Sequence, residues 1–272
     1  MGGTDSLHCV RTAGPVGRSA LGCGWAAAPR LTRTPWEVVV VRARTGGGLA
    51  VAASLGYGAL YLAGRRAGST AAERAARLPG DDVVSRSTMV TDHAVTVGAS
   101  PVQVWPWLAQ LGWRLGGYYT PRWVDRLLFP ANWPSLDRLD PLLVRDLAVG
   151  DVIPDGPPGT AWYVVAEVER PHTLVLHSTT HVPPGWRRRG AMIDWTWTFR
   201  LTALPDGRTR LHLRVRGRTA PWWLTWGYHA VLVPADWVMA TGMLRGVRRR
   251  VEAAPAPGPS GRRPFAEAGR AG

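Results

Sequence analysis

The sequence predicts an α+β domain in which a curved antiparallel sheet wraps around a long C-terminal helix. Two neighbouring segments, residues 191–204 and 209–217, alternate between apolar and polar side chains with the period of two that strands require. Between residues 233 and 251, apolar side chains recur at helical spacing while arginines occupy the other faces. Such a helix needs an apolar surface to cover, and one face of the sheet supplies it.

The other elements of the domain follow in order before the two long strands. A first strand is predicted over residues 88–97. Ser100-Pro101 begins a helix, because serine caps a helix and proline fits its first position, and a Thr-Pro pair begins a second helix over residues 120–129. Shorter strands are predicted over residues 150–153, 160–169 and 173–178. Pro205-Asp206-Gly207 is typical of a hairpin turn.

The alternation also assigns side chains to the two faces of the hairpin. The apolar face is formed by Ile193, Trp195, Trp197, Phe199, Leu201, Leu211, Leu213 and Val215. The polar face carries Asp194, Thr196, Thr198, Arg200, Arg210, His212, Arg214 and Arg216. We expect the polar face to be exposed to solvent, as in an antiparallel sheet that is covered on one side only.

The segments outside this domain have a different composition. Residues 1–45 show no sustained period, and residues 253–272 are rich in Pro, Gly and Ala, which predicts a disordered tail. Between Arg44 and Arg65 lie twenty uncharged residues, and a helix of that length spans about 30 Å. Residues 46–64 are therefore predicted to form a single transmembrane helix, in preference to a buried helix or a signal sequence. Residues 65–87 are then a linker to the domain at residues 88–252.

Charge and cysteine content exclude some classes of protein. All 33 basic residues are arginine and the net charge is +14, but the charge is spread along the chain and accompanies no nucleic-acid-reading motif. Attraction to an anionic membrane surface accounts for it at least as well. Equal numbers of arginines precede and follow residues 46–64. The excess of positive charge that would mark the cytoplasmic side is therefore missing, and the orientation in the membrane stays open. Cys9 and Cys23 precede the domain, so a disulfide framework or a cysteine zinc site within it is excluded.

No catalytic or metal-binding pattern stands out, and no cofactor is predicted. His177 and His181 are four residues apart at a strand end, where they do not share a helix face, so they are expected to be exposed or structurally hydrogen-bonded. No nucleophile motif occurs. We expect an apolar pocket between the sheet and the long helix, and a carboxyl group inside it could act as an acid or base. Glu167 could point either way, whereas Asp194 is expected to face outward.

Tryptophan is abundant, with 15 in the chain. Many of them are expected to fill the core, but tryptophan also suits ligand cavities and membrane interfaces, because it joins a large apolar area to one N–H donor. Trp222, Trp223 and Trp226 precede the last helix in a loop or short helix. They could lie in the interfacial layer of a membrane, gate the pocket, or simply pack.

Several strings in this domain carry a resemblance to a known family. They are SPVQVWPWL (100–108), GWRLGGYYTPRW (112–123), LAVGDVI (147–153) and MLRGVRRRVE (243–252). Together with the element order, they resemble the START-like or SRPBCC superfamily, which includes the polyketide cyclase/dehydrase-like proteins, and within it a membrane-tethered actinobacterial-type branch. The resemblance covers about 165 of 272 residues. It implies a helix-grip fold with a cavity for lipids, sterols, polyketides or other apolar ligands, and it implies no reaction.

The leading hypothesis is a membrane-tethered protein that holds an apolar small molecule or lipid in a helix-grip cavity. The predicted ligand contacts are Trp107, Tyr118, Tyr119, Trp123, Trp195, Trp197, Phe199 and Trp237. Two alternatives stay open: a polyketide cyclase/dehydrase-like enzyme that uses one acid or base in the same pocket, and a protein-interaction domain whose pocket has collapsed. The identity of the ligand and the oligomeric state stay open as well.

Overall fold

The computed structural model describes residues 35–128 and 135–254, and the side chains from Gly48 onward apart from Leu128. The chain divides into two compact units, Met1–Ser54 and Leu55–Gly272. Helix α1 (Pro35–Arg66) includes residues 46–64 and begins earlier than predicted. The transmembrane helix over residues 46–64 stays a prediction. The predictions for residues 1–34 and 255–272 lie outside the described residues.

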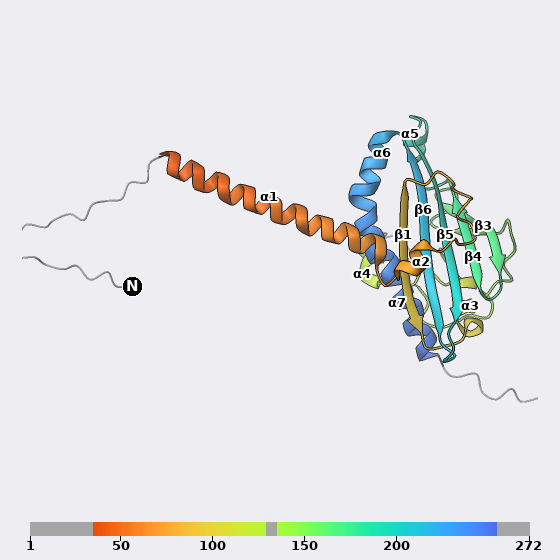
Figure 1. Ribbon diagram of the computed structural model, residues 1–272. Helices are drawn as coiled ribbons and strands as arrows, with labels where there is room; N and C mark the ends of the chain where they lie inside the picture. The colour runs from red at the N-terminus through yellow and green to blue at the C-terminus, as the bar shows by residue number, and fades with distance from the viewer. Residues whose placement is uncertain (1–34, 129–134, 255–272) are drawn as a thin grey trace, which may run out of the picture. The chain divides into compact units, whose positions relative to one another are not determined.

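Six strands form one antiparallel sheet in the order β1-β6-β5-β4-β3-β2 (Figure 1). They are β1 (Met89–Val97), β2 (Val152–Pro154), β3 (Trp162–Glu169), β4 (Thr173–Ser178), β5 (Met192–Ala203) and β6 (Thr209–Ala220). The long β5–β6 hairpin lies at the centre and pairs Trp197 with Val215. Each strand that the alternation predicts is confirmed to within a few residues.

Two short helices precede the sheet's later strands, as the capping signals predict. They are α3 (Pro101–Ala109) and α4 (Arg122–Leu128). At the start of α3, the Ser100 backbone N–H donates to Gln103 Oε1 at 3.0 Å, which completes a capping box. Two further helices, α2 (Ala71–Ala75) and α5 (Pro184–Arg187), were not predicted.

The last helical stretch combines three elements. Helix α6 (Trp222–Gly227) continues through a π-helical turn, η1 (Tyr228–Leu232), into α7 (Val233–Ala253). Within the described part of the chain, this is the one helix whose length and composition would allow it to cross a membrane. However, α7 packs against the inner face of the sheet beside β1, where Ala240, Leu244 and Val247 are each at most 2% exposed. We therefore assign α7 to the core of the domain.

The core lies between α7, α3 and the inner face of the sheet. From the sheet come Phe199, Leu201, Leu211 and Leu213, all fully buried, as the alternation predicts. The architecture is thus α+β, with a six-stranded antiparallel sheet around a long C-terminal helix, and the predicted fold class is confirmed at that level.

The outer face of the sheet differs from the prediction. His212 and Arg214 on β6 are only 4% and 3% exposed, because α2 and the chain after it cover them. All five N–H donors of Arg214 are paired, with the backbone oxygens of Glu73, Arg74 and Ala76 and with carboxylate oxygens of two aspartates. The expectation of a solvent-exposed face is wrong here, because a fully paired arginine can be buried. Part of the segment predicted as a linker (65–87) is this cover.

Candidate functional site

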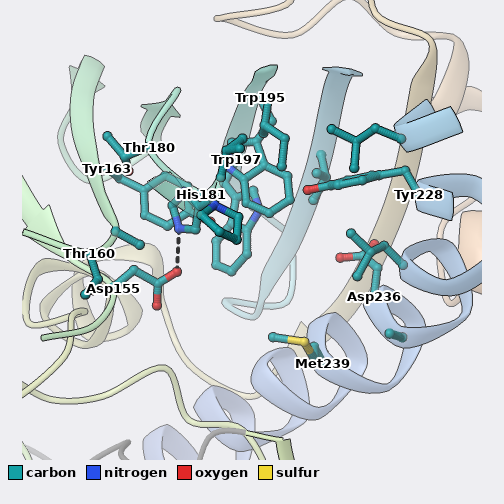
Figure 2. A pocket seen from close by; sticks show the side chains of 18 of the residues that line it. Asp155, Thr160, Tyr163, Thr180, His181, Trp195, Trp197, Tyr228, Asp236 and Met239 are labelled. Carbon is teal, nitrogen blue, oxygen red and sulfur yellow. Dashed lines mark hydrogen bonds and ion pairs between the residues drawn. The ribbon is translucent and has the colours of Figure 1, made fainter. Parts of the chain in front are cut away.

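A cavity of about 770 Å³ opens between the inner face of the sheet, α7 and the α6–η1 segment. Figure 2 shows Tyr163, His181, Trp195 and Trp197 gathered on one side of it and Asp236 on the other, with Tyr228 at the end of the aromatic cluster. Strands β3 and β5 supply the aromatic side, and α7 supplies the opposite side. The volume falls in the range of pockets that enclose small molecules, about 300–1,000 Å³.

The aromatic side of the cavity is a set of rings that fix one another. The ring centroids of Tyr163 and Trp197 are 5.1 Å apart, and those of His181 and Trp195 are 4.9 Å apart. Tyr228 meets Trp195 edge to face at 5.9 Å. Aromatic pairs at such separations contribute about 0.5–1.5 kcal/mol each beyond area burial. These rings therefore hold one another in place.

Two polar groups on this wall have no hydrogen-bond partner within the described residues. They are the hydroxyl of Tyr163, a residue that is fully buried, and Nε1 of Trp195. Burial, followed by the negative charge of Asp155, raises the pKa of Tyr163 well above its ordinary value, so its hydroxyl keeps its proton. An unsatisfied buried polar group costs about 1–3 kcal/mol. Both atoms are buried in this structure, so a ligand in the cavity would accept from either of them only after a shift of the ring.

Beside these rings, His181 joins a carboxylate to a hydroxyl. Its Nε2 lies 2.8 Å from Asp155 Oδ2, and its Nδ1 lies 2.8 Å from Ser178 Oγ. Ser178 is 3% exposed, donates to the backbone oxygen of Trp162 at 2.6 Å, and does not line the cavity. The arrangement therefore orients His181 and Asp155 and does not present a serine nucleophile. His177 likewise bonds to Asp194, at 2.8 Å. Both histidines are structurally hydrogen-bonded, as predicted.

A second pair faces the aromatic wall from α7. Asp236 Oδ2 accepts a hydrogen bond from Thr91 Oγ1 at 2.7 Å and lies 2.9 Å from His93 Nε2. His93 is fully buried, and its Nδ1 has no partner among the described residues. Thr91 and His93 thus hold the Asp236 side chain through one of its two oxygens.

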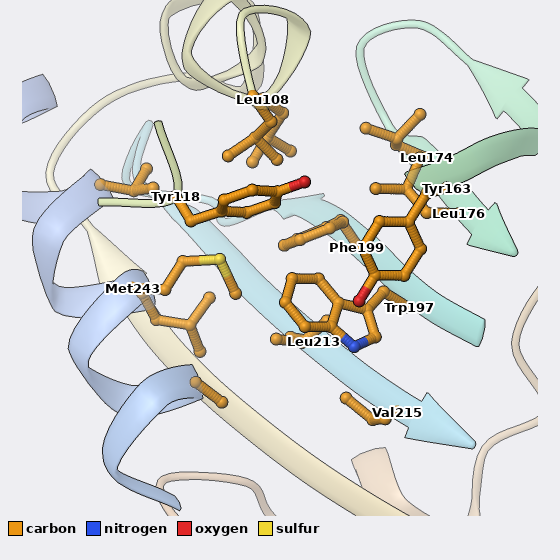
Figure 3. Packing of buried hydrophobic residues seen from close by; sticks show 14 of the residues in the cluster. Leu108, Tyr118, Tyr163, Leu174, Leu176, Trp197, Phe199, Leu213, Val215 and Met243 are labelled. Carbon is orange, nitrogen blue, oxygen red and sulfur yellow. The ribbon is translucent and has the colours of Figure 1, made fainter. Parts of the chain in front are cut away.

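The predicted ligand contacts divide into two groups. Tyr118, Trp195 and Trp197 line the cavity. The other five do not: Trp107, Tyr119, Trp123, Phe199 and Trp237. Figure 3 shows Phe199 packed among the core side chains next to Trp197 and Leu213.

Besides Phe199, two of these five lie in the core and two are exposed or partly exposed. Trp107 and Tyr119 pack edge to face at 5.7 Å, and the Tyr119 hydroxyl donates to the Trp107 backbone oxygen at 2.9 Å, so both belong to the core. Trp123 is 57% exposed on α4, and Trp237 is partly exposed on α7 outside the cavity.

Sequence reasoning did not identify Asp155, Tyr163, His181, Tyr228 and Asp236 as lining residues. For Tyr163 a signal exists, because the alternation over residues 160–169 places it on one face with Val165. Glu167, which the sequence left open, is exposed after a bulge in β3. Asp155 and Asp236 stand in a loop and on a helix whose partners are distant in sequence, so no local pattern marks them.

A second hollow, of about 710 Å³, lies on the other side of the α6–η1 segment. Tyr61 Oη is 2.9 Å from His229 Nδ1, and Tyr57 Oη donates to the backbone oxygen of Ala230 at 2.8 Å. Trp222 and Trp226 line this hollow and are 74% and 71% exposed. Trp223, in contrast, lines the main cavity. The α6–η1 segment thus separates an apolar outer surface from the cavity.

Among the residues described here, no group of three or more His, Cys, Asp or Glu side chains could hold a metal ion. No family model and no curated protein matches the chain.

Several solved structures match with low identity. A protein from Mesorhizobium loti is 16% identical over 62% of this chain and 100% of its own, with a TM-score of 0.36. A hypothetical protein from Helicobacter pylori is 12% identical over 64% of this chain and 95% of its own, with a TM-score of 0.41. A norcoclaurine synthase mutant from Thalictrum is 14% identical over 60% of this chain and 94% of its own, with a TM-score of 0.37. Because these TM-scores lie below 0.5, the fold rests on the sheet and helix above, and the START-like resemblance stays a prediction from the sequence.

Proposed function

We propose that this protein is a membrane-tethered binding protein that encloses an apolar small molecule or lipid in the cavity. The observation that carries the proposal is an aromatic cavity of about 770 Å³ on whose wall the Tyr163 hydroxyl and Trp195 Nε1 lack partners. Burial of apolar ligand surface against such walls favours binding by about 25 cal/mol for each Å² removed from water. The two donors would fix the orientation of a ligand that carries a hydrogen-bond acceptor.

The tether is supported by the side chains of α1. Its last turn ends in Arg65 and Arg66, and the preceding turns expose large apolar side chains, including Leu49, Leu55 and Leu62 at 72%, 69% and 50%. Large apolar residues that are followed by arginines at a helix end suit a bilayer core and its headgroup layer. The exposed Trp222 and Trp226 suit the same interfacial layer.

The test is recovery of a ligand from full-length protein purified out of its own membrane. Native mass spectrometry should detect an organic molecule that co-purifies in reproducible stoichiometry. Ala235→Trp fills the cavity from α7 and should abolish recovery, whereas Ala253→Trp at the exposed end of the same helix should not. Equal recovery from both variants, or none from the wild type, would count against the proposal.

A second candidate function is acid–base catalysis on the bound molecule, which the Asp155–His181 pair favours. His181 Nε2 lies 2.8 Å from Asp155 Oδ2 on the cavity wall, and a carboxyl group oriented in this way could exchange a proton with a ligand. The test is to incubate the recovered molecule with purified protein and to follow its mass. Conversion that Asp155→Asn removes would establish the enzyme, and an unchanged mass would support binding alone. The open cavity gives no support to the third alternative, a collapsed pocket.

A further inference from the structure

The charges that line the cavity are opposite in sign to those of the whole protein. The chain has 33 basic residues and a net charge of +14. Among the described residues that line the cavity there are three aspartates, Asp125, Asp155 and Asp236, and no arginine. A random sample of this chain's charged side chains would be mostly arginine. The cavity is therefore a local site of negative charge.

Asp236 has the clearest opening toward a ligand. Both of its hydrogen bonds within the described residues, from Thr91 and His93, use Oδ2. Oδ1 has no such bond, and the side chain is 16% exposed. Asp236 therefore has one carboxylate oxygen without a hydrogen bond from the described residues.

The other two carboxylates contribute differently. Asp125 accepts a hydrogen bond from Thr120 Oγ1 at 2.5 Å, and burial raises its pKa above the ordinary value. Asp155 lines the cavity, with its Oδ2 2.8 Å from His181 Nε2. Asp155 and Asp236 therefore set the potential from opposite sides.

The aromatic side adds to the same preference. Trp195, Trp197, Tyr163 and Tyr228 line the cavity, and the faces of such rings attract cations within about 6 Å by about 0.5–2 kcal/mol. Burial, followed by the charge of Asp236, raises the pKa of Tyr228 far above its ordinary value. That hydroxyl therefore keeps its proton at pH 7.

We propose that the cavity selects an apolar amine, whose ammonium group pairs with Asp236 while its apolar body packs on the rings of Trp195 and Trp197. The inference rests on the proposed binding function and narrows its ligand class. A carboxylate amphiphile of equal size would find no cationic partner among the described lining residues and would meet two aspartates. The Tyr163 hydroxyl, which is buried and has no partner among the described residues, belongs to the same wall.

The experiment compares three molecules that share one apolar group: 2-(2-naphthyl)ethylamine, 2-(2-naphthyl)ethanol and 2-naphthylacetate. Their affinities for the full-length protein in detergent are measured by isothermal titration calorimetry at pH 7. The amine should bind at least ~10-fold more tightly than the alcohol, because a charge-assisted hydrogen bond in a buried site has about that effect. The carboxylate should bind more weakly than both.

Asp236→Asn keeps an acceptor for Thr91 and His93 and removes the charge. It should lower the amine-to-alcohol affinity ratio by ~10-fold or more. Asp146→Asn, at a side chain that is 85% exposed, makes the same charge change outside the cavity and should leave the ratio unchanged. The ratio cancels any general loss of folded protein, because both ligands use the same preparation.

The outcomes separate this inference from the proposed function. If all three molecules bind alike, or if Asp236→Asn leaves the ratio unchanged, the amine preference is overturned and binding of apolar molecules stands. If the carboxylate binds best, the sign of the preference is wrong. Binding of none of the three counts against both proposals.

Discussion

Glu73 on α2 and Arg210 on β6 form a two-pronged ion pair, with Oε1 2.6 Å from Nε and Oε2 2.9 Å from Nη2. This pair fastens the segment after α1 to the outer face of the sheet. The hydrogen bond from Arg210 outweighs the effect of burial and lowers the pKa of Glu73 from 4.5 to about 2. A carboxyl whose pKa is lowered on folding stabilises the protein above its unfolded pKa, and the stabilisation is lost as the pH falls through the folded pKa.

The first prediction is that Glu73→Gln lowers the free energy of unfolding at pH 7 by about 1–3 kcal/mol. The difference from wild type should shrink as the pH falls from about 4.5 toward 2, because the wild-type carboxyl is then protonated as well. Urea unfolding at several pH values measures it. Glu169→Gln, at a carboxylate that is 63% exposed beside Arg200, is the control and should change stability by less than about 0.5 kcal/mol. A pH-independent difference would contradict the assignment.

The second prediction concerns the close contact between α7 and the chain before α4. A Cβ on Gly246 would overlap the backbone oxygen of Tyr119, whereas a Cβ on Gly227 in α6 would meet nothing within 4 Å. Gly246→Ala should therefore destabilise the protein by about 1–3 kcal/mol, although alanine is the better helix former. Gly227→Ala should be neutral or stabilise by up to about 1 kcal/mol. Thermal unfolding of both variants measures these changes in stability. A stabilised Gly246→Ala protein would show that α7 lies further from Tyr119 than in this structure.

The sequence predicted most of the sheet, because burial repeats along each strand with a fixed period. Trp195, Trp197 and Phe199 face inward, as their alternation requires. The same pattern could not show what covers the other face. Arg214 alternates like a solvated residue whether its partners are water molecules or the backbone oxygens of Glu73 and Arg74. That distinction depends on contacts across more than 130 residues of chain.

The candidate site was less predictable than the sheet. Trp195 and Trp197 follow from strand periodicity, and Tyr118 from its place beside the predicted first helices. Asp155 and Asp236 come together across the cavity only through the curvature of the sheet and the path of α7. A tryptophan count also does not separate Trp107, which fills the core, from Trp195, which lines the cavity.

The third prediction uses the unpartnered hydroxyl of Tyr163. Tyr163→Phe removes a buried group that has no partner among the described residues, so the ligand-free protein should be as stable as wild type or up to about 1–2 kcal/mol more stable. The same change should weaken a ligand that carries an acceptor by about 2- to 10-fold. Stability and affinity should therefore change in opposite directions.

The matched control is Tyr119→Phe. The Tyr119 hydroxyl accepts from Gln110 Nε2 and donates to the Trp107 backbone oxygen, both at 2.9 Å. Its loss should destabilise the protein by about 1–3 kcal/mol and leave the affinity for that ligand unchanged. If Tyr163→Phe destabilises the free protein as much as Tyr119→Phe does, its hydroxyl has a partner within the protein.

The fourth prediction places α6 against a lipid surface. Trp222 and Trp226 are 74% and 71% exposed on the side of α6 away from the cavity, where water would otherwise contact two indole rings. In lipid nanodiscs, bromine-labelled acyl chains quench only tryptophans that lie in the bilayer. The double variant Trp222→Phe/Trp226→Phe should therefore lose a large part of the quenchable emission of the full-length protein, since phenylalanine keeps the apolar contact but not the emission. Trp123→Phe, at an indole that is 57% exposed on α4, should leave the quenchable part unchanged. If Trp123→Phe lowered the quenchable emission as much as the double variant does, quenching would follow from exposure alone and would not show that α6 faces the membrane.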